Sequence, residues 1–338
     1  MLSFKNLHTR IKNEGFQFSS IKITHFHFLL NLLVKKIHIS IVLFILIGNF
    51  QQIIANDIAS NKFKEDVYKG FSTIYNFQFL KADSIIKNLK KDYPEMAGTY
   101  ILAANYYWWL IISGEDNKSV RINYLTNLEL ALQKINKVKP NLLSDDDIYN
   151  LICIYAYKVR LDAMNKNYLK AFKDLNDCIT ILKFSFDKEI AYEPFNLTTG
   201  LYNYLIGQIK KKYPFLLVYT VFLPYGNKTK GLAMLQKITK SDDEILFAEA
   251  NYFLMKIYLE EEDNMVKAEN CCITLTNSYN SNLLYRYYYF KILLLTGKKD
   301  ESQKQLEILV QESNTNNELT LLQKKHFIDL ARKYLEKK

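Results

Sequence analysis

The feature that most constrains the fold of this chain is a repeated spacing near its C-terminal end. Two segments with the same pattern, Met265–Ala268 and Lys299–Ser302, begin 34 residues apart. Each follows a turn and precedes an apolar helical stretch. A period of this length, with a small residue at the fourth position, is typical of arrays of antiparallel helix pairs. The spacing therefore predicts an all-α chain built by stacking such pairs.

The same register can be placed near the start of the helical part. Phe79 and Ala82 repeat the spacing from a large residue to a small one, and Gly70 stands at a second small position. Pro94 comes where the second helix of the pair should end, because proline cannot continue a helix. Small residues at Gly70 and Ala82 would let two antiparallel helices approach closely. We expect the first helix pair over residues 63–94.

Helix starts are signalled elsewhere along the chain. Tyr168 and Ala171 repeat the aromatic-to-alanine spacing of the first pair. Ser144–Asp147 and Ser241–Glu244 each read as a capping box, in which the serine side chain accepts from the first turn of a helix. These signals predict further helix pairs, although the distances between them are not multiples of the period.

The middle of the chain therefore needs helix pairs of irregular length. Two pairs with inserted loops fit residues 97–140 and 190–240, and Leu319–Lys338 reads as a terminal helix with a polar outer face. The predicted fold is a right-handed α-solenoid of about five to six antiparallel helix pairs with a C-terminal capping helix. We expect it to form one continuous domain over residues 56–338.

Composition fits a helical globular domain and argues against nucleic-acid binding. The chain is 49% hydrophobic but has only 10 Gly and 5 Pro, which suits long helices joined by short turns. The net charge of +10 comes from 45 basic and 35 acidic residues, and half of it lies in residues 1–55. The remainder has no concentrated basic stripe of the kind that neutralises phosphates. We expect no nucleic acid among the partners.

The first 55 residues are predicted to direct the chain out of the cytoplasm. Lys35-Lys36 precedes an apolar run over residues 37–48, which together resemble a secretory signal. The run is shorter than the roughly 20 residues of a spanning helix, but an uncleaved membrane anchor over residues 37–54 and a buried helix stay open as alternatives. We expect an exported protein of the periplasm or cell envelope. A further hypothesis is that residues 1–32 do not belong to the natural product.

Four cysteines follow the apolar run: Cys153, Cys178, Cys271 and Cys272. An even number in an exported chain permits disulfides. However, Cys178 and Cys272 occupy apolar helical positions, where a thiol commonly acts as a small hydrophobic group. Adjacent Cys271 and Cys272 point to different sides of a helix. Buried free thiols are therefore the favoured interpretation.

The pattern resembles the tetratricopeptide-repeat family over most of residues 60–338, most clearly over 63–94 and 245–310. The element Gly200–Tyr204, with the sequence G-L-Y-N-Y, is similar to a narrower group. That group contains uncharacterised exported bacterial tetratricopeptide-like proteins and, more distantly, mitochondrial outer-membrane proteins with a G-x-Y-N-Y element. The resemblance implies a non-enzymatic scaffold that binds a protein or peptide in a concave groove.

Carried onto this sequence, the resemblance implies partner-binding residues on the first helices of three pairs: Arg160, Phe253, Ile257, Glu260, Tyr287 and Lys291. A second candidate surface is the aromatic segment that follows three lysines at residues 210–212. There Phe215 and Phe222 could meet a partner or rest on an anionic membrane surface. Packing of this segment against its own helix pair is the alternative.

The sequence offers little to support catalysis. Four of the five histidines precede the expected cleavage point, and the fifth, His326, reads as a solvated helix residue. The sequence contains no nucleophile elbow, no phosphate-binding loop and no zinc-ligand spacing. Asp145–Asp147 reads as the acidic first turn of a helix, and Glu260–Asp263 as a solvated turn. We expect no enzymatic activity, no cofactor, no metal and no small-molecule substrate.

Both tryptophans lie in Tyr106–Trp109. Core packing between helix pairs is the favoured interpretation, with a contact hot spot for a partner as the alternative. Two other functions stay open: an extracytoplasmic enzyme or enzyme accessory that carries an α-solenoid, and a membrane-associated assembly factor that uses residues 210–225.

Overall fold

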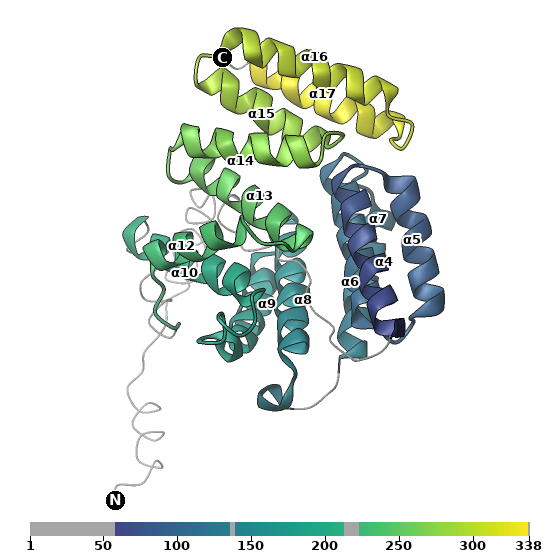
Figure 1. The fold of residues 1–338 in the computed structure, drawn as a ribbon, viewed down its shortest axis with the longest axis vertical. Helices are drawn as coiled ribbons and strands as arrows, with labels where there is room; N and C mark the ends of the chain where they lie inside the picture. The colour runs from purple at the N-terminus through teal and green to yellow at the C-terminus, as the bar shows by residue number, and fades with distance from the viewer. Residues whose placement is uncertain (1–57, 136–138, 213–222, 337–338) are drawn as a thin grey trace, which may run out of the picture. The chain divides into compact units, whose positions relative to one another are not determined.

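The computed structural model describes residues 58–135, 139–212 and 223–336. They belong to one compact unit, Val42–Lys338. Within the described residues the chain forms 13 α-helices and no β-strand, so the all-α prediction is confirmed for this part (Figure 1). The domain boundary expected at residue 55, and the signal or anchor before it, lie outside the described residues.

The helices pack as six consecutive antiparallel pairs followed by a final helix, α17 (Leu321–Glu336). The first helices of the pairs are α4 (Ile58–Tyr75), α6 (Ala97–Ile112), α8 (Asp145–Met164), α10 (Phe195–Lys212), α13 (Glu244–Glu260) and α15 (Leu283–Leu295). The second helices are α5 (Phe79–Asp92), α7 (Lys118–Lys134), α9 (Tyr168–Leu182), α12 (Lys228–Ile238), α14 (Met265–Ser278) and α16 (Lys299–Thr315). This arrangement is consistent with a helical repeat array. No helix in the described ranges is long and apolar enough to cross a bilayer.

One turn geometry recurs between the two helices of a pair. Phe77, Lys166, Asp263 and Gly297 all have positive φ, and each lies two residues before the second helix begins. Glycine adopts this left-handed conformation without strain, whereas the other three residues adopt it at a cost of about 1 kcal/mol or more. Because this turn recurs, α14 and α16 begin 34 residues apart, as their sequence spacing predicts.

The small residue of the repeat has one constant place. Ala82, Ala171, Gly231, Ala268 and Ser302 are each the fourth residue of the second helix of a pair, and each is buried. A close approach to the first helix of the pair is seen at Gly231, where an added Cβ would lie 2.4 Å from the Tyr204 backbone nitrogen, and at Ser302, whose hydroxyl donates to the Phe290 carbonyl at 3.3 Å.

Gly70 has a different neighbour from the one expected. A Cβ added there would lie 2.4 Å from Leu102 Cδ2 of α6, so Gly70 allows close contact with the next pair and not with α5. The end of the first pair is as expected, since α5 stops at Asp92 and Pro94 follows. Both tryptophans are 2% exposed, which confirms that Trp108 and Trp109 pack in the core.

The G-L-Y-N-Y element holds α10 against α12. A Cβ added at Gly231 would lie 2.4 Å from the backbone nitrogen of Tyr204, so the two helices meet backbone to backbone. Asn203 Oδ1 accepts from the backbone N–H of Asn227 at 3.1 Å. The Tyr202 hydroxyl donates to the Pro224 carbonyl at 2.6 Å. The element therefore fixes the point at which the chain returns to begin α12.

The first helix pair contacts helices near the C-terminal end. α4 packs against α13, and the Tyr75 hydroxyl donates to Glu249 Oε1 at 2.7 Å. The side-chain amide of Asn282, which caps α15, donates to the Tyr75 carbonyl at 2.7 Å. All three residues are buried. We call the contacts of α4–α6 with α13–α17 the closing interface.

Aromatic rings fill the closing interface. The Tyr75 ring meets that of Tyr279, which follows α14, edge to face with centroids 5.4 Å apart, and Trp109 meets Tyr285 of α15 at 6.0 Å. Phe77 packs on Phe327 of α17 at 5.7 Å. Each such pair contributes about 0.5–1.5 kcal/mol beyond the area it buries. The interface is thus part of the hydrophobic core.

Polar groups also link the two ends. The N-cap residue of α5, Gln78, makes no side-chain capping bond. Instead, Glu318 of the α16–α17 loop accepts from the backbone N–H groups of Leu80 and Lys81 at 2.7 and 3.2 Å. A carboxylate placed there satisfies free donors and is favoured by the helix dipole. The C-terminal part of the chain therefore caps a helix of the first pair.

The start of α13 differs from the predicted capping box. Asp243 caps the helix, accepting from two backbone N–H groups of its first turn, whereas Ser241 lies too early to do so. The Ser241 hydroxyl donates to Glu193 instead, at 3.0 Å. At α8 the predicted cap is confirmed, because Ser144 accepts from the backbone of Asp147 at 3.1 Å.

Two side chains expected in solvent make tertiary contacts. His326 is half-buried against the turn between α6 and α7, where a Cβ added at Gly114 would lie 2.8 Å from the His326 Cβ, and burial lowers the pKa of His326. Glu262 accepts from the Tyr204 hydroxyl at 2.6 Å and pairs with Lys228 at 2.7 Å. The turn after α13, predicted to be solvated, therefore ties this helix to α10 and α12.

Replacing Gly231 with alanine should destabilise the fold by about 2–3 kcal/mol or more, because the added methyl group meets backbone atoms that cannot rotate away. Urea unfolding followed by circular dichroism measures the change. Gly70→Ala is the matched control, with a smaller expected cost, since its nearest neighbour is the flexible end of Leu102. Equal losses for the two variants would contradict the backbone-to-backbone packing of α10 and α12.

Candidate functional site

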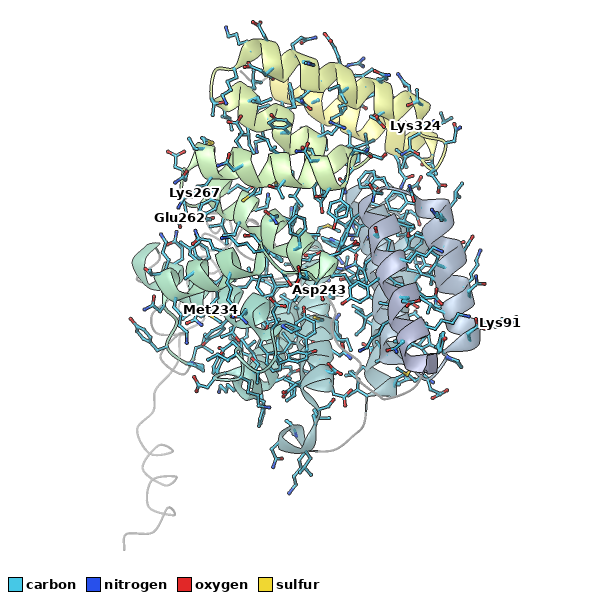
Figure 2. The ribbon with its side chains drawn as sticks, in the orientation of Figure 1. Lys91, Met234, Asp243, Glu262, Lys267 and Lys324 are labelled. Carbon is cyan, nitrogen blue, oxygen red and sulfur yellow. The ribbon has the colours of Figure 1, made fainter. Side chains whose placement is uncertain are left out.

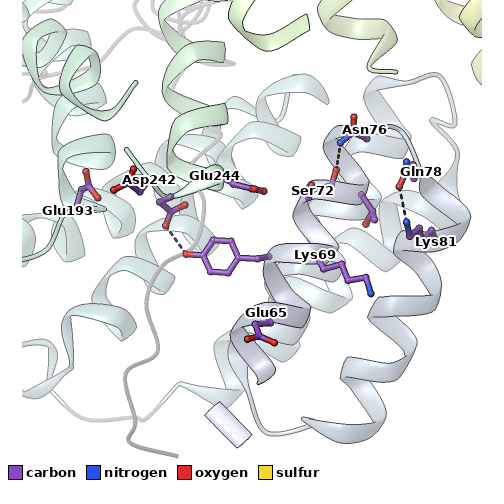
Figure 3. A pocket seen from close by; sticks show the side chains of 12 residues that line it. Glu65, Lys69, Ser72, Asn76, Gln78, Lys81, Glu193, Asp242 and Glu244 are labelled. Atoms are coloured by element: carbon purple, nitrogen blue, oxygen red, sulfur yellow. Dashed lines mark hydrogen bonds between the residues drawn. The ribbon is translucent and has the colours of Figure 1, made fainter. Parts of the chain in front are cut away.

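A polar cleft of about 790 Å³ lies where α4 faces the start of α13 (Figure 3). Its α4–α5 wall is built by residues of α4, the following turn and the first turn of α5. Its opposite wall comes from the segment before α10 and from the α12–α13 turn. The lining residues are Glu65, Tyr68, Lys69, Ser72, Thr73, Asn76, Gln78, Lys81, Glu193, Asp242, Asp243 and Glu244.

The two walls are joined at the floor by one hydrogen bond. The Tyr68 hydroxyl of α4 donates to Asp243 Oδ2 at 2.8 Å. Asp243 Oδ1 meanwhile accepts from the backbone N–H groups of Ile245 and Leu246 at 2.8 and 2.9 Å. One carboxylate therefore caps α13 and holds α4 at the same time. Figure 2 marks Asp243 at the start of α13.

Asp243 is also electrostatically unusual. Its side chain is only 8% exposed, and this burial raises its pKa to about 7, while hydrogen bonds from the Leu246 and Ile245 backbone oppose the shift. The nearby carboxylate of Glu244 raises the pKa further. Asp243 can therefore change its charge close to neutral pH, at the point where the two walls meet.

Charged side chains line both walls. Figure 3 shows the carboxylates Glu193, Asp242 and Glu244 on the α13 side, and Lys69, Lys81 and the carboxylate Glu65 on the α4–α5 side. Within the part of the chain that the structure describes, the side chains of Lys69, Asp242 and Glu244 make no hydrogen bond or ion pair. Their charges are thus available to a molecule in the cleft.

A second cavity, of about 360 Å³, continues along the closing interface. It shares Asn76, Gln78 and Lys81 with the first cavity, so the two are contiguous. The rest of its lining comes from the α14–α15 loop, α16 and the α16–α17 loop: Ser281, Glu312, Thr315, Asn316 and Glu318. We call the two cavities together the seam cleft.

Some of the residues predicted to line a groove are buried, and others are partly exposed. Arg160 is one of the buried residues. Its side chain is 0% exposed, and its guanidinium carbon lies 4.1 Å from the Trp108 ring centroid and 3.8 Å from that of Tyr157. Arg160 Nε donates to the Tyr124 hydroxyl at 2.6 Å. Arg160 thus ties together α6, α7 and α8.

Phe253 and Ile257 of α13 are buried as well, at 2% and 0% exposure. They face the interior of the helix array, where the closing interface places other aromatic side chains. A partner can touch Arg160, Phe253 or Ile257 only if helices move apart. Their role in partner binding stays a prediction.

Glu260, Tyr287 and Lys291 are partly exposed and lie near one another on α13 and α15. Glu260 pairs with Lys256, and Lys256 Nζ donates to the Tyr288 hydroxyl at 2.9 Å. Lys291 Nζ lies 5.9 Å from the Tyr288 ring centroid, and burial lowers the pKa of Lys291. Binding at this surface is also untested. Phe215 and Phe222 lie outside the described residues.

The four cysteines line neither cavity of the seam cleft. All four cysteines are free, and burial raises the pKa of each thiol. Cys178 and Cys272 donate to backbone carbonyls at 3.6 and 3.3 Å, as expected of buried thiols in a helical core. Among the described residues, no group of His, Cys, Asp and Glu side chains is placed to hold a metal ion.

Sequence reasoning did not identify the seam cleft. Tyr68 and Asp243 are 175 residues apart, and no repeat pattern indicates that the first helix pair contacts the fifth. The acidic run at Asp242–Glu244 was the available signal, and it reads as a helix start. Its position opposite α4 depends on the closing interface.

Comparison with known proteins identifies no family. No protein-family model matches the chain, and neither a curated protein nor a solved structure is significantly similar to it.

Asp243→Asn should change how stability depends on pH. A carboxylate whose pKa is higher in the folded state binds protons more tightly when folded, so wild-type stability falls as pH rises from about 4 to about 7. Asparagine is an equally good helix cap but does not titrate. The free energy of unfolding of the variant, relative to that of wild type, should therefore increase over this pH range by on the order of 2 kcal/mol.

Urea unfolding at pH 5 and at pH 7.5 measures this difference. The exposed neighbour supplies the control variant, Asp242→Asn, which should keep the wild-type pH dependence. A constant difference between Asp243→Asn and wild type at the two pH values would show that Asp243 does not titrate in this window.

Proposed function

We propose that this protein is a non-enzymatic scaffold of the tetratricopeptide type that binds a segment of another protein in the seam cleft. The observation that carries the proposal is the cleft itself, a polar cavity of about 790 Å³ with unpaired charges on both walls. The sequence also predicts a scaffold, but with its partner in a concave groove. We propose that the partner binds in the seam cleft instead.

The repeat features support the tetratricopeptide type. Consecutive antiparallel pairs, a recurring left-handed turn and a buried small fourth residue in five of the second helices all agree with it. The 34-residue step between α14 and α16 has the length of that repeat.

The character of the cleft supports a polypeptide partner. Pockets for small molecules are mostly apolar with a few polar groups, whereas this cleft is lined largely by charged, amide and hydroxyl side chains. Such groups can pair with the backbone and side chains of a peptide.

We also propose that binding takes place in the cell envelope. The basic pair Lys35-Lys36 and the apolar run after it support export or membrane attachment. A partner in the periplasm or at the membrane surface would then meet the seam cleft directly.

A cross-linking experiment tests the scaffold function. Lys69, an exposed residue on the α4 wall, is replaced by the photoreactive amino acid p-benzoyl-phenylalanine. Irradiation of the envelope fraction of cells that make this variant should yield a covalent adduct with another protein, visible as a shifted band and identifiable by mass spectrometry.

The control carries the same replacement at Lys304, an exposed residue of α16 that lines neither cavity. The adduct should be absent there. Adducts of equal yield at both positions, or no adduct at Lys69, would count against binding in the seam cleft.

A further inference from the structure

We propose that the seam cleft takes an extended peptide segment with spaced basic side chains, separated by small or neutral residues. This inference rests on the proposed scaffold function and names the chemistry of its partner. The two cavities of the seam cleft lie along one line of contact between the first helix pair and the C-terminal pairs.

The extended conformation follows from the continuity of the two cavities. They share the Asn76, Gln78 and Lys81 lining, and their other residues come from opposite ends of the closing interface. An occupant of both must therefore pass over the α4–α5 turn. An extended strand advances about 3.3 Å per residue, compared with about 1.5 Å in a helix, so an extended segment spans both cavities with the fewest residues.

Side chains that suit a peptide backbone line this path. Ser72, Asn76 and Gln78 lie on the α4–α5 wall, and Asn316 faces them in the second cavity. Hydroxyl and amide groups both donate and accept hydrogen bonds, so they can pair with exposed N–H and C=O groups of an extended chain. Among the described residues, Gln78 Oε1 accepts only one long hydrogen bond, from Lys81 Nζ at 3.5 Å.

The balance of charge selects basic side chains. The first cavity has five carboxyl side chains and two lysines in its lining, and the second adds Glu312 and Glu318. Glu318 is already used to cap α5, and Asp243 is held by Tyr68. The side chains of Asp242 and Glu244 remain exposed and unpaired in the described structure, so on the α13 side they are the carboxylates that a basic side chain would meet.

The lysines limit how many basic residues the segment can carry. Lys69 and Lys81 lie on the α4–α5 wall, opposite Asp242 and Glu244, and both are exposed. A continuous run of basic residues would bring like charges against them. Basic residues separated by small or neutral ones can reach the acidic wall while the backbone passes the lysines.

Fluorescence anisotropy with synthetic peptides tests this preference. The probe is fluorescein-labelled (Gly-Lys-Ser)₃, and the comparison peptides are (Gly-Glu-Ser)₃ and Lys₉. The full-length protein should bind (Gly-Lys-Ser)₃ more tightly than either comparison peptide, and its affinity should fall as salt is added.

The cleft variant is Asp242→Asn with Glu244→Gln, which removes two unpaired charges beside the cap of α13. Its affinity for (Gly-Lys-Ser)₃ should fall about five-fold, as expected for two solvent-accessible ion pairs. The matched control is Asp300→Asn with Glu301→Gln, which removes two acids from the first turn of α16, outside both cavities. It should bind within about two-fold of wild type.

Three results would overturn the inference: equal affinity for the Lys and Glu peptides, tightest binding of Lys₉, or equal losses in the two double variants. Thermal unfolding of both variants confirms that each is folded before binding is measured. If cross-linking from Lys69 succeeds while the charge preference is absent, the scaffold function survives and only the basic segment is rejected. If neither experiment gives a signal, both are rejected.

Discussion

The structure depends on the contact that Tyr75 makes with the C-terminal pairs. A unit in a helical array buries its apolar face against its neighbours, so the outer face of a terminal unit needs separate cover. Among the described residues, α4 and α6 obtain that cover from α13, α15 and α17. Tyr75 bonds to Glu249 through its hydroxyl and to Asn282 through its carbonyl, and its ring packs on Trp109. Tyr75 is therefore buried, with its hydroxyl and its carbonyl both hydrogen-bonded within the protein.

Two features of the structure bear on where a partner could bind. Phe253 and Ile257, which were expected to line an open groove, are buried in the core. The line along which the two sets of helices meet is incompletely filled, and polar cavities remain there. The proposed peptide site exists only while α4 is held against α13, partly through Tyr68 and Asp243.

Local features of the fold could be predicted from sequence, but contacts between distant pairs could not. Three local features could be predicted because each depends on a few neighbouring residues whose types indicate the local geometry: the 34-residue step, the small residue at Ala82 and the cap at Ser144. The assignment of Ser241 as a cap failed because the helix begins two residues later than expected, so that Asp243 is the residue that accepts from the backbone of Ile245 and Leu246. The seam cleft was missed for a different reason: the partners of Tyr68 and Tyr75 lie more than 170 residues away, and a repeat pattern describes only adjacent units.

A double-mutant cycle across the closing interface tests this account most directly. Tyr75→Phe removes the hydroxyl that donates to Glu249, and Glu249→Met removes the acceptor while keeping a similar volume. Urea unfolding of wild type, both single variants and the double variant gives the coupling free energy. The account predicts a coupling of at least about 1 kcal/mol, as for a buried hydrogen bond to a carboxyl group. Additive effects, with a coupling below about 0.3 kcal/mol, would contradict the closure of the first helix pair onto α13.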